Sequence, residues 1–207
     1  MVAPLQADAV RKPGDHKGRP YGWQASITKK SYAPCHTMRS VSSCFREWPP
    51  MKEMIMTPRL NPFAAAPAPM KSWLDWSTGI QKCGLEDSLM ELVKIRASQI
   101  NGCAVCLHMH TAAARKHGET EERLYLLDAW RESPLYSERE RAALGWTEAL
   151  TLVSETHAPD DVYRALQAQF TEQEQVTLTL LIVAINGWNR IQVGFRAVHP
   201  VQQRQAA

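Results

Sequence analysis

Two cysteines and a histidine in the middle of the chain have the spacing of a thiol redox site. Cys103 and Cys106 form a C-x-x-C pair, and His110 follows four residues after the second cysteine. Residues three and four apart share one face of a helix, so the two thiols and the imidazole would lie together. Cys103 would sit in the first helical turn, where free N–H groups and the helix dipole favour a thiolate. Cys106 could then reach Cys103 to form a disulfide, and His110 could take a thiol proton.

A carboxylate from the preceding segment can join this group. Glu91 lies twelve residues before Cys103, on a helix that we expect to run from Asp87 to Ile100. Asn101-Gly102 is a strong helix stop, because both residue types tolerate a positive φ. If the two helices pack as a hairpin around this stop, Glu91 meets the cysteine–histidine pair. It would then orient the imidazole or relay a proton.

Three other uses of these side chains are open. A zinc ion would accept Cys103, Cys106 and His110, with His108 as a further candidate ligand, although structural zinc sites usually take two ligand pairs separated by a loop. Thioredoxin-like chemistry needs a strand before the C-x-x-C, and here an amphipathic helix precedes it. Two structural cysteines in a helical core are the simplest alternative. The phase of His110 and the charge of Glu91 on an apolar face both argue against it.

The elements that must position these residues are all helical. From Pro67 onward the apolar residues recur with helical spacing, and no alternating strand pattern occurs. Capping boxes at Ser137–Glu140 and Thr171–Glu174 predict two helix starts. The run 176–185 that follows the second box is apolar nearly all round, so its helix must be central or shared with another subunit. We predict an all-α domain of about seven helices with short loops.

Other side chains are expected to be structural. Cys83 is expected to be a buried small hydrophobic residue at the end of one helical face, and His108 is expected at the surface or an interface. The segment 186–190, Asn-Gly-Trp-Asn-Arg, interrupts the last apolar helix, where a kink or packing contact is favoured over a contact with the site. Two further helices are expected, from 104 to 117 and from 120 to 133. Val153 is expected on the buried side of the helix that starts at Ser137. The expected face that ends with Cys83 consists of Trp73, Leu74, Trp76, Ile80 and Cys83.

Composition separates the first fifty residues from the rest. The chain has 207 residues, of which 44% are hydrophobic and 22% charged, as in globular proteins. Residues 1–50 carry eight Lys/Arg, three Asp/Glu and six of the thirteen prolines, with no apolar periodicity. We expect them to be a disordered basic extension or a start assigned too far upstream, with a targeting role as an alternative. The functional domain would then span residues 51–207.

Several classes of protein are excluded by the same arithmetic. The whole chain has a net charge of +3, but residues 51–207 carry 16 basic and 18 acidic residues. The positive charge therefore belongs to residues 1–50 and argues little for nucleic-acid binding by the domain. The longest strongly apolar run is about half of what a membrane helix needs, which excludes a transmembrane protein. Five unevenly spaced cysteines are too few for a disulfide-stapled secreted fold. We expect a cytoplasmic protein, in which one reversible disulfide would lie in a reducing compartment.

The segment from Glu91 to His110 resembles the core of the alkylhydroperoxidase D-like (carboxymuconolactone decarboxylase-like) family. The motif of that family is a Glu, eleven residues, C-x-x-C, three residues and a His, and all four positions match here. The resemblance covers roughly residues 56–202. It implies an all-α fold that assembles as trimers or hexamers. For members with the cysteine pair it also implies thiol-dependent peroxidase activity that requires no metal, flavin or haem.

The resemblance also assigns roles by position. Cys106 would be the peroxidatic cysteine that attacks a hydroperoxide and becomes a sulfenic acid, and Cys103 would resolve it to a disulfide. His110 and Glu91 would form the proton relay. An external dithiol reductant or a thiol adaptor protein would regenerate the pair by exchange. The best-known member has a histidine directly before its peroxidatic cysteine, whereas this chain has Val105, which leaves the relay one member short.

Two further expectations complete the functional prediction. The decarboxylase branch of the family lacks the cysteine pair, so lactone decarboxylation is not expected. The alternative to a peroxidase is a non-catalytic, redox-responsive oligomeric protein that uses the same Cys103–Cys106 pair. In either case neither nucleic acid nor a membrane is expected as a partner.

Overall fold

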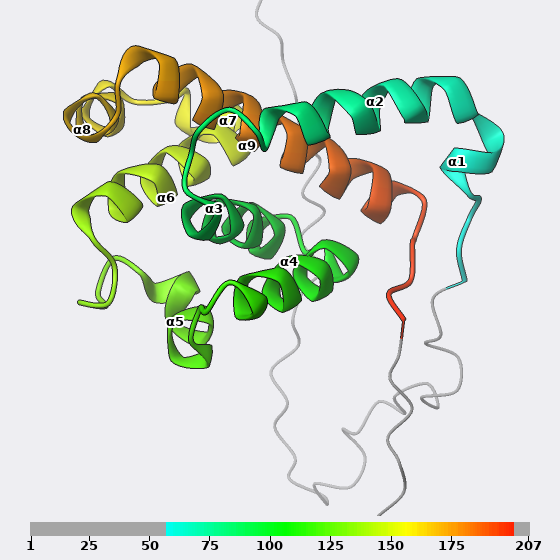
Figure 1. The fold of residues 1–207 in the computed structure, drawn as a ribbon, viewed down its shortest axis with the longest axis horizontal. Coiled ribbons are helices and arrows are strands. Elements are labelled where there is room, and N and C mark those ends of the chain that lie inside the picture. Colours follow the sequence, from blue (N-terminus) through cyan, green and yellow to red (C-terminus); the bar gives the residue numbers. More distant parts are fainter. Residues whose placement is uncertain (1–56, 201–207) are drawn as a thin grey trace, which may run out of the picture. The chain divides into compact units, whose positions relative to one another are not determined.

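Helices and short loops make up residues 57–200, the part of the chain that the computed structural model describes (Figure 1). This range contains no strand, which confirms the all-α prediction. The expectations for residues 1–50 lie outside the described residues. Besides the predicted helices, the described range holds two four-residue helices, α1 and α7. In chain order the helices are α1 (Pro62–Ala65), α2 (Pro67–Ile80), α3 (Asp87–Ile100), α4 (Ala104–Lys116), α5 (Glu121–Leu126), α6 (Glu138–Thr151), α7 (Val153–Thr156), α8 (Asp160–Gln169) and α9 (Glu172–Gly194).

The helix that carries Glu91 is the centre of the packing. α3 packs against α4, α6 and α9, and Figure 1 shows it between α4 and α9. Its apolar side chains Leu92, Val93 and Ile95 are no more than 1% exposed. A helix enclosed on several sides is held by tight contacts on each side. The bounds predicted for α3, Asp87 to Ile100, are confirmed.

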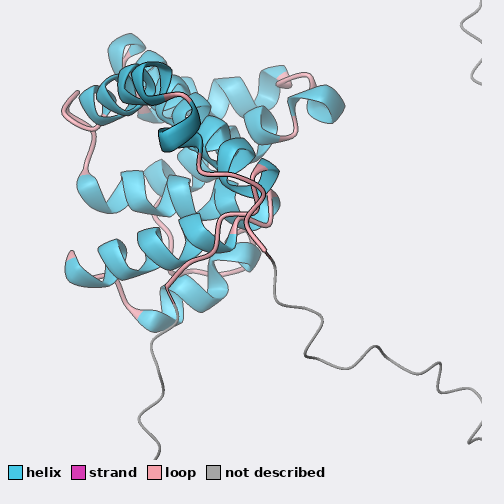
Figure 2. Ribbon diagram, turned by 90° about the vertical axis from the view of Figure 1, so that its right-hand side faces the viewer, coloured by secondary structure: helices cyan, strands magenta, loops and turns pink. Residues whose placement is uncertain are grey.

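The last helix is the second central element. By length and composition alone α9 could cross a membrane, but it packs against α2, α3, α4, α6 and α8. Leu178, Leu181 and Ile182 on this helix are at most 2% exposed. It is therefore a core helix of the domain, as the apolar run predicted. Figure 2 shows from the side how short loops join it and the other helices.

Helix starts were predicted better than helix ends. Both capping boxes are present. Ser137 and Glu140 form the one at the start of α6, and Thr171 and Glu174 form the one at the start of α9. The helix expected from 120 to 133 ends at Leu126 and continues as a 3₁₀ turn at Leu127–Ala129. A capping side chain marks a start by its own hydrogen bond, whereas several of these ends are set by tertiary contacts.

Two residues expected in the core are exposed because their helices end before them. Cys83 is exposed, and the expectation that it is buried was wrong. α2 ends at Ile80, so Cys83 has left the helical face to which its spacing assigned it. Val153 is 51% exposed for the same reason, since α6 ends at Thr151. On α2 itself Leu74 and other members of the predicted face are also partly exposed.

A close approach of α2 to α9 gives a test of the packing. A Cβ atom added at Gly187 of α9 would lie 2.4 Å from Cζ2 of the Trp73 ring. We expect Gly187→Ala to lower the free energy of unfolding by about 1–3 kcal/mol, because overpacking forces the ring or the helix to shift. Urea denaturation measures this change.

The matched control is Gly79→Ala in α2, where nothing lies within 4 Å of the added Cβ. Alanine is a better helix former than glycine, so this substitution should stabilise the protein by up to about 1 kcal/mol. Equal free energies of unfolding for the two variants would contradict the close α2–α9 contact.

Candidate functional site

The connection between α3 and α4 positions the two cysteines. Gly102 has a φ of +64°, and its N–H donates to the carbonyl of Gln99 while the N–H of Cys103 donates to the carbonyl of Ser98. These two bonds form a Schellman motif, which ends a helix through a left-handed residue. Cys103 is also the N-cap of α4, where its sulfur accepts from the N–H of Cys106 at 3.4 Å. One residue thus ends the first helix and begins the second.

The sulfurs of Cys103 and Cys106 lie 2.7 Å apart, and both residues are buried. Hydrogen bonding with Cys106 lowers the pKa of Cys103 to about 6, because it stabilises the thiolate against the opposing effect of burial. The same pairing raises the pKa of Cys106, since a charged sulfur already lies beside it and burial adds to the effect. The pairing therefore favours a thiolate on Cys103 and leaves the proton that the two sulfurs share on Cys106.

Glu91 and His110 meet across the α3–α4 hairpin, as predicted. Glu91 Oε2 lies 2.9 Å from His110 Nδ1, so Nδ1 carries a proton that it donates to the carboxylate, which leaves Nε2 free to accept one. Lys94, one turn further along α3, donates from Nζ to Glu91 Oε1 at 2.5 Å. Burial tends to raise the pKa of Glu91, but the bonds from His110 and Lys94 outweigh it and lower that pKa.

A polar network from α9 lies behind the cysteines. Asn189 is 1% exposed and donates to Ser98 Oγ at 3.0 Å, while Asn101 donates to Asn189 Oδ1 at 2.9 Å. Hydrogen bonding from the Asn189 side chain helps to lower the pKa of Cys103. The polar segment 186–190 therefore contacts the site, although packing was the favoured expectation. Its signal in the sequence was the interruption of an apolar helix.

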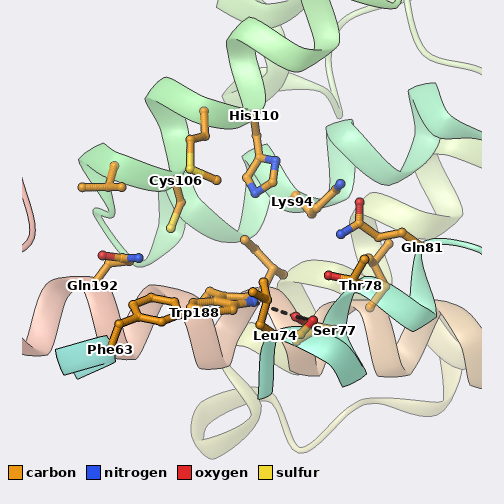
Figure 3. Close-up of a pocket in the computed structure, with 15 residues that line it drawn as sticks. Phe63, Leu74, Ser77, Thr78, Gln81, Lys94, Cys106, His110, Trp188 and Gln192 are labelled. Atoms are coloured by element: carbon orange, nitrogen blue, oxygen red, sulfur yellow. Dashed lines mark hydrogen bonds between the residues drawn. The ribbon is translucent and has the colours of Figure 1, made fainter. Parts of the chain in front are cut away.

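An apolar cavity of about 330 Å³ adjoins Cys106 and His110. In Figure 3 these two side chains form one wall, and Phe63 and Trp188 lie opposite them. Trp188 Nε1 donates to Ser77 Oγ at 3.1 Å, so the main polar atom of that wall already has a partner. The cavity is thus shaped for an apolar body, with the sulfur and the imidazole as its reactive edge.

The four predicted site residues therefore lie together, and the structure adds Lys94 and Asn189 to them. The helical hairpin brings Glu91 and His110 into contact beside the cysteine pair. His108 is exposed, as expected, and its ring stacks on His199 at a centroid distance of 4.9 Å. Among the described residues no group of three or more His, Cys, Asp or Glu side chains is arranged to hold a metal ion.

Comparison with known proteins identifies the family of the chain. The sequence model of the carboxymuconolactone decarboxylase family matches residues 67–149. The uncharacterised protein YdfG of Bacillus subtilis (strain 168) is 42% identical over 138 residues, which cover 67% of this chain and 94% of YdfG. The chain belongs to the carboxymuconolactone decarboxylase family. The resemblance inferred from the Glu91–His110 segment is thereby confirmed.

Two solved structures are similar to this one over most of their length. A protein of unknown function from Agrobacterium tumefaciens, described as a candidate antioxidant defence protein AhpD, is 46% identical with a TM-score of 0.69. The match covers 70% of this chain and all of that one. An uncharacterised peroxidase-related protein from Silicibacter sp. TM1040 is 19% identical with a TM-score of 0.60, over 67% of this chain and 74% of that one. This second likeness shows the shared fold alone.

The shared proton of the cysteine pair gives a spectroscopic prediction for this family member. With Cys35, Cys44 and Cys83 replaced by serine, thiolate absorbance at 240 nm should rise with a midpoint at about pH 6. Cys106→Ala removes the main hydrogen-bonding partner of the Cys103 thiolate, so the midpoint should move up by roughly one unit or more.

Asn189→Leu provides a second measurement of the same midpoint. Leucine fills a similar volume without the amide, so a smaller upward shift is expected. The matched control is Asn61→Leu, because Asn61 only caps α1 and its loss should leave the 240 nm midpoint in place. An unchanged midpoint in both Cys106→Ala and Asn189→Leu would show that these side chains do not stabilise the thiolate.

Proposed function

We propose that this protein is a thiol-dependent peroxidase that reduces hydroperoxides through the Cys103–Cys106 pair. The observation that carries the proposal is that His110, held by Glu91, lines an apolar cavity together with Cys106. A reactive cysteine needs thiolate character and a route for its ligand. Both are present here in one place, beside a second cysteine within disulfide reach.

Cys106 is the sulfur assigned to attack, because it lines the cavity together with His110. The negative charge of the pair moves to Cys106 when the shared proton passes to Cys103 over 2.7 Å. The Cys106 thiolate attacks the terminal oxygen of the hydroperoxide, and the O–O bond breaks. The product alkoxide takes a proton and leaves as an alcohol, and Cys106 becomes a sulfenic acid.

Cys103 then resolves the sulfenic acid. The Cys103 thiol loses its proton, which the hydrogen bond from Asn189 favours, and the thiolate attacks the Cys106 sulfur to form the disulfide and release hydroxide. The hydroxide takes a proton and leaves as water. An external dithiol reductant or a thiol adaptor protein restores the two thiols by exchange. No step in this cycle calls for a metal, flavin or haem.

The Glu91–Lys94–His110 group supplies the proton relay. The Glu91 carboxylate fixes His110 so that Nε2 is the atom that takes and returns protons in the cavity. Lys94 keeps Glu91 ionised, since burial alone would favour its neutral form. Val105 takes the place of the extra histidine of the best-known member. The relay proposed here therefore passes through His110 alone, with Lys94 as a positioning residue.

An oligomer in the cytoplasm is part of the proposal. Val176, Leu180 and Val183 on α9 are 60%, 39% and 49% exposed, and their i, i+4, i+7 spacing forms one apolar stripe. Such a stripe supports assembly into the trimers or hexamers typical of the family. A disulfide that must be reduced in each cycle is suited to a reducing compartment.

The first test is consumption of cumene hydroperoxide with dithiothreitol as reductant. Cys106→Ser removes the attacking sulfur, so turnover should be lost. Cys83→Ser is the control and should retain turnover, because Cys83 does not line the cavity and is not a member of the cysteine pair. Turnover by Cys106→Ser at the wild-type rate would overturn the assignment. A wild-type protein whose thiols respond to hydroperoxide but do not turn over would support the non-catalytic alternative.

The second test concerns the relay. Glu91→Gln leaves His110 without its carboxylate, so the rate of hydroperoxide reduction should fall about 100-fold. The control is Glu155→Gln. Glu155 is exposed, so this substitution removes the same charge at a position away from the site. Loss of turnover to the same extent in both variants would indicate an effect of net charge and not of the relay.

Lys94→Met provides a third test through the pH profile. Lys94 lowers the pKa of Glu91, so its removal raises that pKa and keeps Glu91 protonated to a higher pH. The acid limb of the rate–pH profile should therefore move to higher pH, and turnover should recover as the pH rises. A uniform loss at all pH values would show that Lys94 supports the fold and not the ionisation of Glu91.

A further inference from the structure

Each sulfur of the cysteine pair faces a cavity of its own. A second cavity of about 290 Å³ is lined by Cys103 together with Arg59 and Arg196. Cys106 and His110 line the first cavity instead. Val105 and Gln192 contribute to both linings, so they form the partition between the two spaces. A molecule that attacks Cys103 therefore has a route separate from that of a molecule that meets Cys106.

The two cavities also differ in charge. Among the described residues that line the second cavity there are two arginines and no carboxylate. Arg59 is fixed at the end of α9, because its Nη1 donates to the carbonyl of Gly194 at 2.8 Å and its N–H to that of Phe195 at 2.9 Å. Lys94, the cation of the first cavity, is paired with Glu91. The second cavity therefore has positive charge available for a ligand.

We propose that the second cavity receives the reductant, a thiol that carries an anionic group, and that this thiol attacks Cys103. The inference rests on the proposed function, since it assigns the regeneration step of the same cysteine pair. The reductant's thiolate forms a bond to the Cys103 sulfur, and the Cys103–Cys106 bond breaks with its electron pair on Cys106. Cys106 takes a proton, and a second thiol displaces Cys103 from the mixed disulfide as the reductant's own disulfide forms.

The geometry of exchange requires an approach to Cys103 that does not pass Cys106, and the second cavity is lined by Cys103 and not by Cys106. In thiol–disulfide exchange the incoming sulfur approaches in line with the bond that breaks, so a thiol that attacks Cys103 comes from the side away from Cys106. The departing Cys106 sulfur lies at the wall that it shares with His110 (Figure 3), which can supply its proton.

The electrostatics of the departing sulfur agree with this direction. The main cause of the raised pKa of Cys106 is its bond with a Cys103 thiolate. In the mixed disulfide Cys103 carries no charge, so this cause is gone. Bonds from Asn189 and Ser98, which lower the pKa of Cys106, remain to stabilise it as it leaves.

The charge of the reductant is tested with two small thiols of similar size. The protein, with Cys35, Cys44 and Cys83 replaced by serine, is oxidised with diamide, and its reduction by 2-mercaptoethanesulfonate or 2-mercaptoethanol is followed in stopped flow. In Arg59→Gln/Arg196→Gln the rate constant per thiolate should fall about tenfold for the sulfonate and less than twofold for the neutral thiol. Arg164→Gln removes an exposed charge on α8 and serves as the control.

Equal losses for the two thiols, or a loss for the sulfonate as large in Arg164→Gln, would overturn the role of the two arginines. The site of attack is read separately. The reaction with the sulfonate thiol is quenched in acid, the free thiol is alkylated with N-ethylmaleimide, and the peptide is sequenced by mass spectrometry. The sulfonate should be found on Cys103 and the maleimide on Cys106, and the reverse pattern would overturn the proposal.

These measurements are independent of peroxidase activity, because diamide and not a hydroperoxide forms the disulfide. A protein that is inert toward hydroperoxides but is reduced at Cys103 with the predicted charge preference would refute the proposed function and retain the reductant site. A protein that turns over hydroperoxides but shows neither preference would retain the function and refute the reductant site.

Discussion

The double role of Cys103 in the backbone is the constraint on which the site depends. Its N–H closes the end of α3, and its sulfur caps the start of α4. With so short a connection the two helices must run back along each other, which sets the register between them. That register places Glu91 opposite His110 and holds Cys106 one turn from Cys103. Because Gly102 needs a left-handed backbone, a side chain there would strain the turn on which all of these contacts depend.

Burial makes Glu91, Lys94 and His110 act as one unit. The Glu91 and Lys94 side chains are only 9% and 5% exposed, and a lone charge at such depth would be expelled or neutralised. Each charge is stable only because the other lies beside it. The pair of Glu91 and Lys94 has no net charge, so it can remain in an apolar wall and still hold the His110 ring in a fixed orientation toward the cavity. A polar site can therefore lie within the apolar packing of α3 and α9.

Sequence reasoning found the parts of the site that depend on local spacing. The bounds of α3, the start of α4 and the grouping of Glu91 with His110 follow from helical periodicity and one helix stop. Lys94 was not singled out, because a lysine between apolar residues has the same pattern whether it faces solvent or a buried carboxylate. The hydrogen bond from Asn189 to Ser98 joins α9 to α3, and no local pattern encodes such a pairing. Cys83 was misplaced because α2 ends three residues before it, at Ile80.

The two cysteines have different surroundings, and each suits a different task. In the proposed cycle Cys106 attacks the hydroperoxide, whereas Cys103 resolves the sulfenic acid and receives the reductant. The wall opposite Cys106 contains Phe63 and Trp188, and its Ser77 hydroxyl accepts a hydrogen bond from Trp188. Binding in the cavity beside Cys106 depends on the apolar body of the substrate. His110 is the group that gives a proton to the departing oxygen. Cys103 instead accepts hydrogen bonds from backbone and side-chain amides, which stabilise negative charge, and shares its cavity with two arginines. A thiolate that waits for the sulfenic acid, and later for an anionic reductant, needs that second environment.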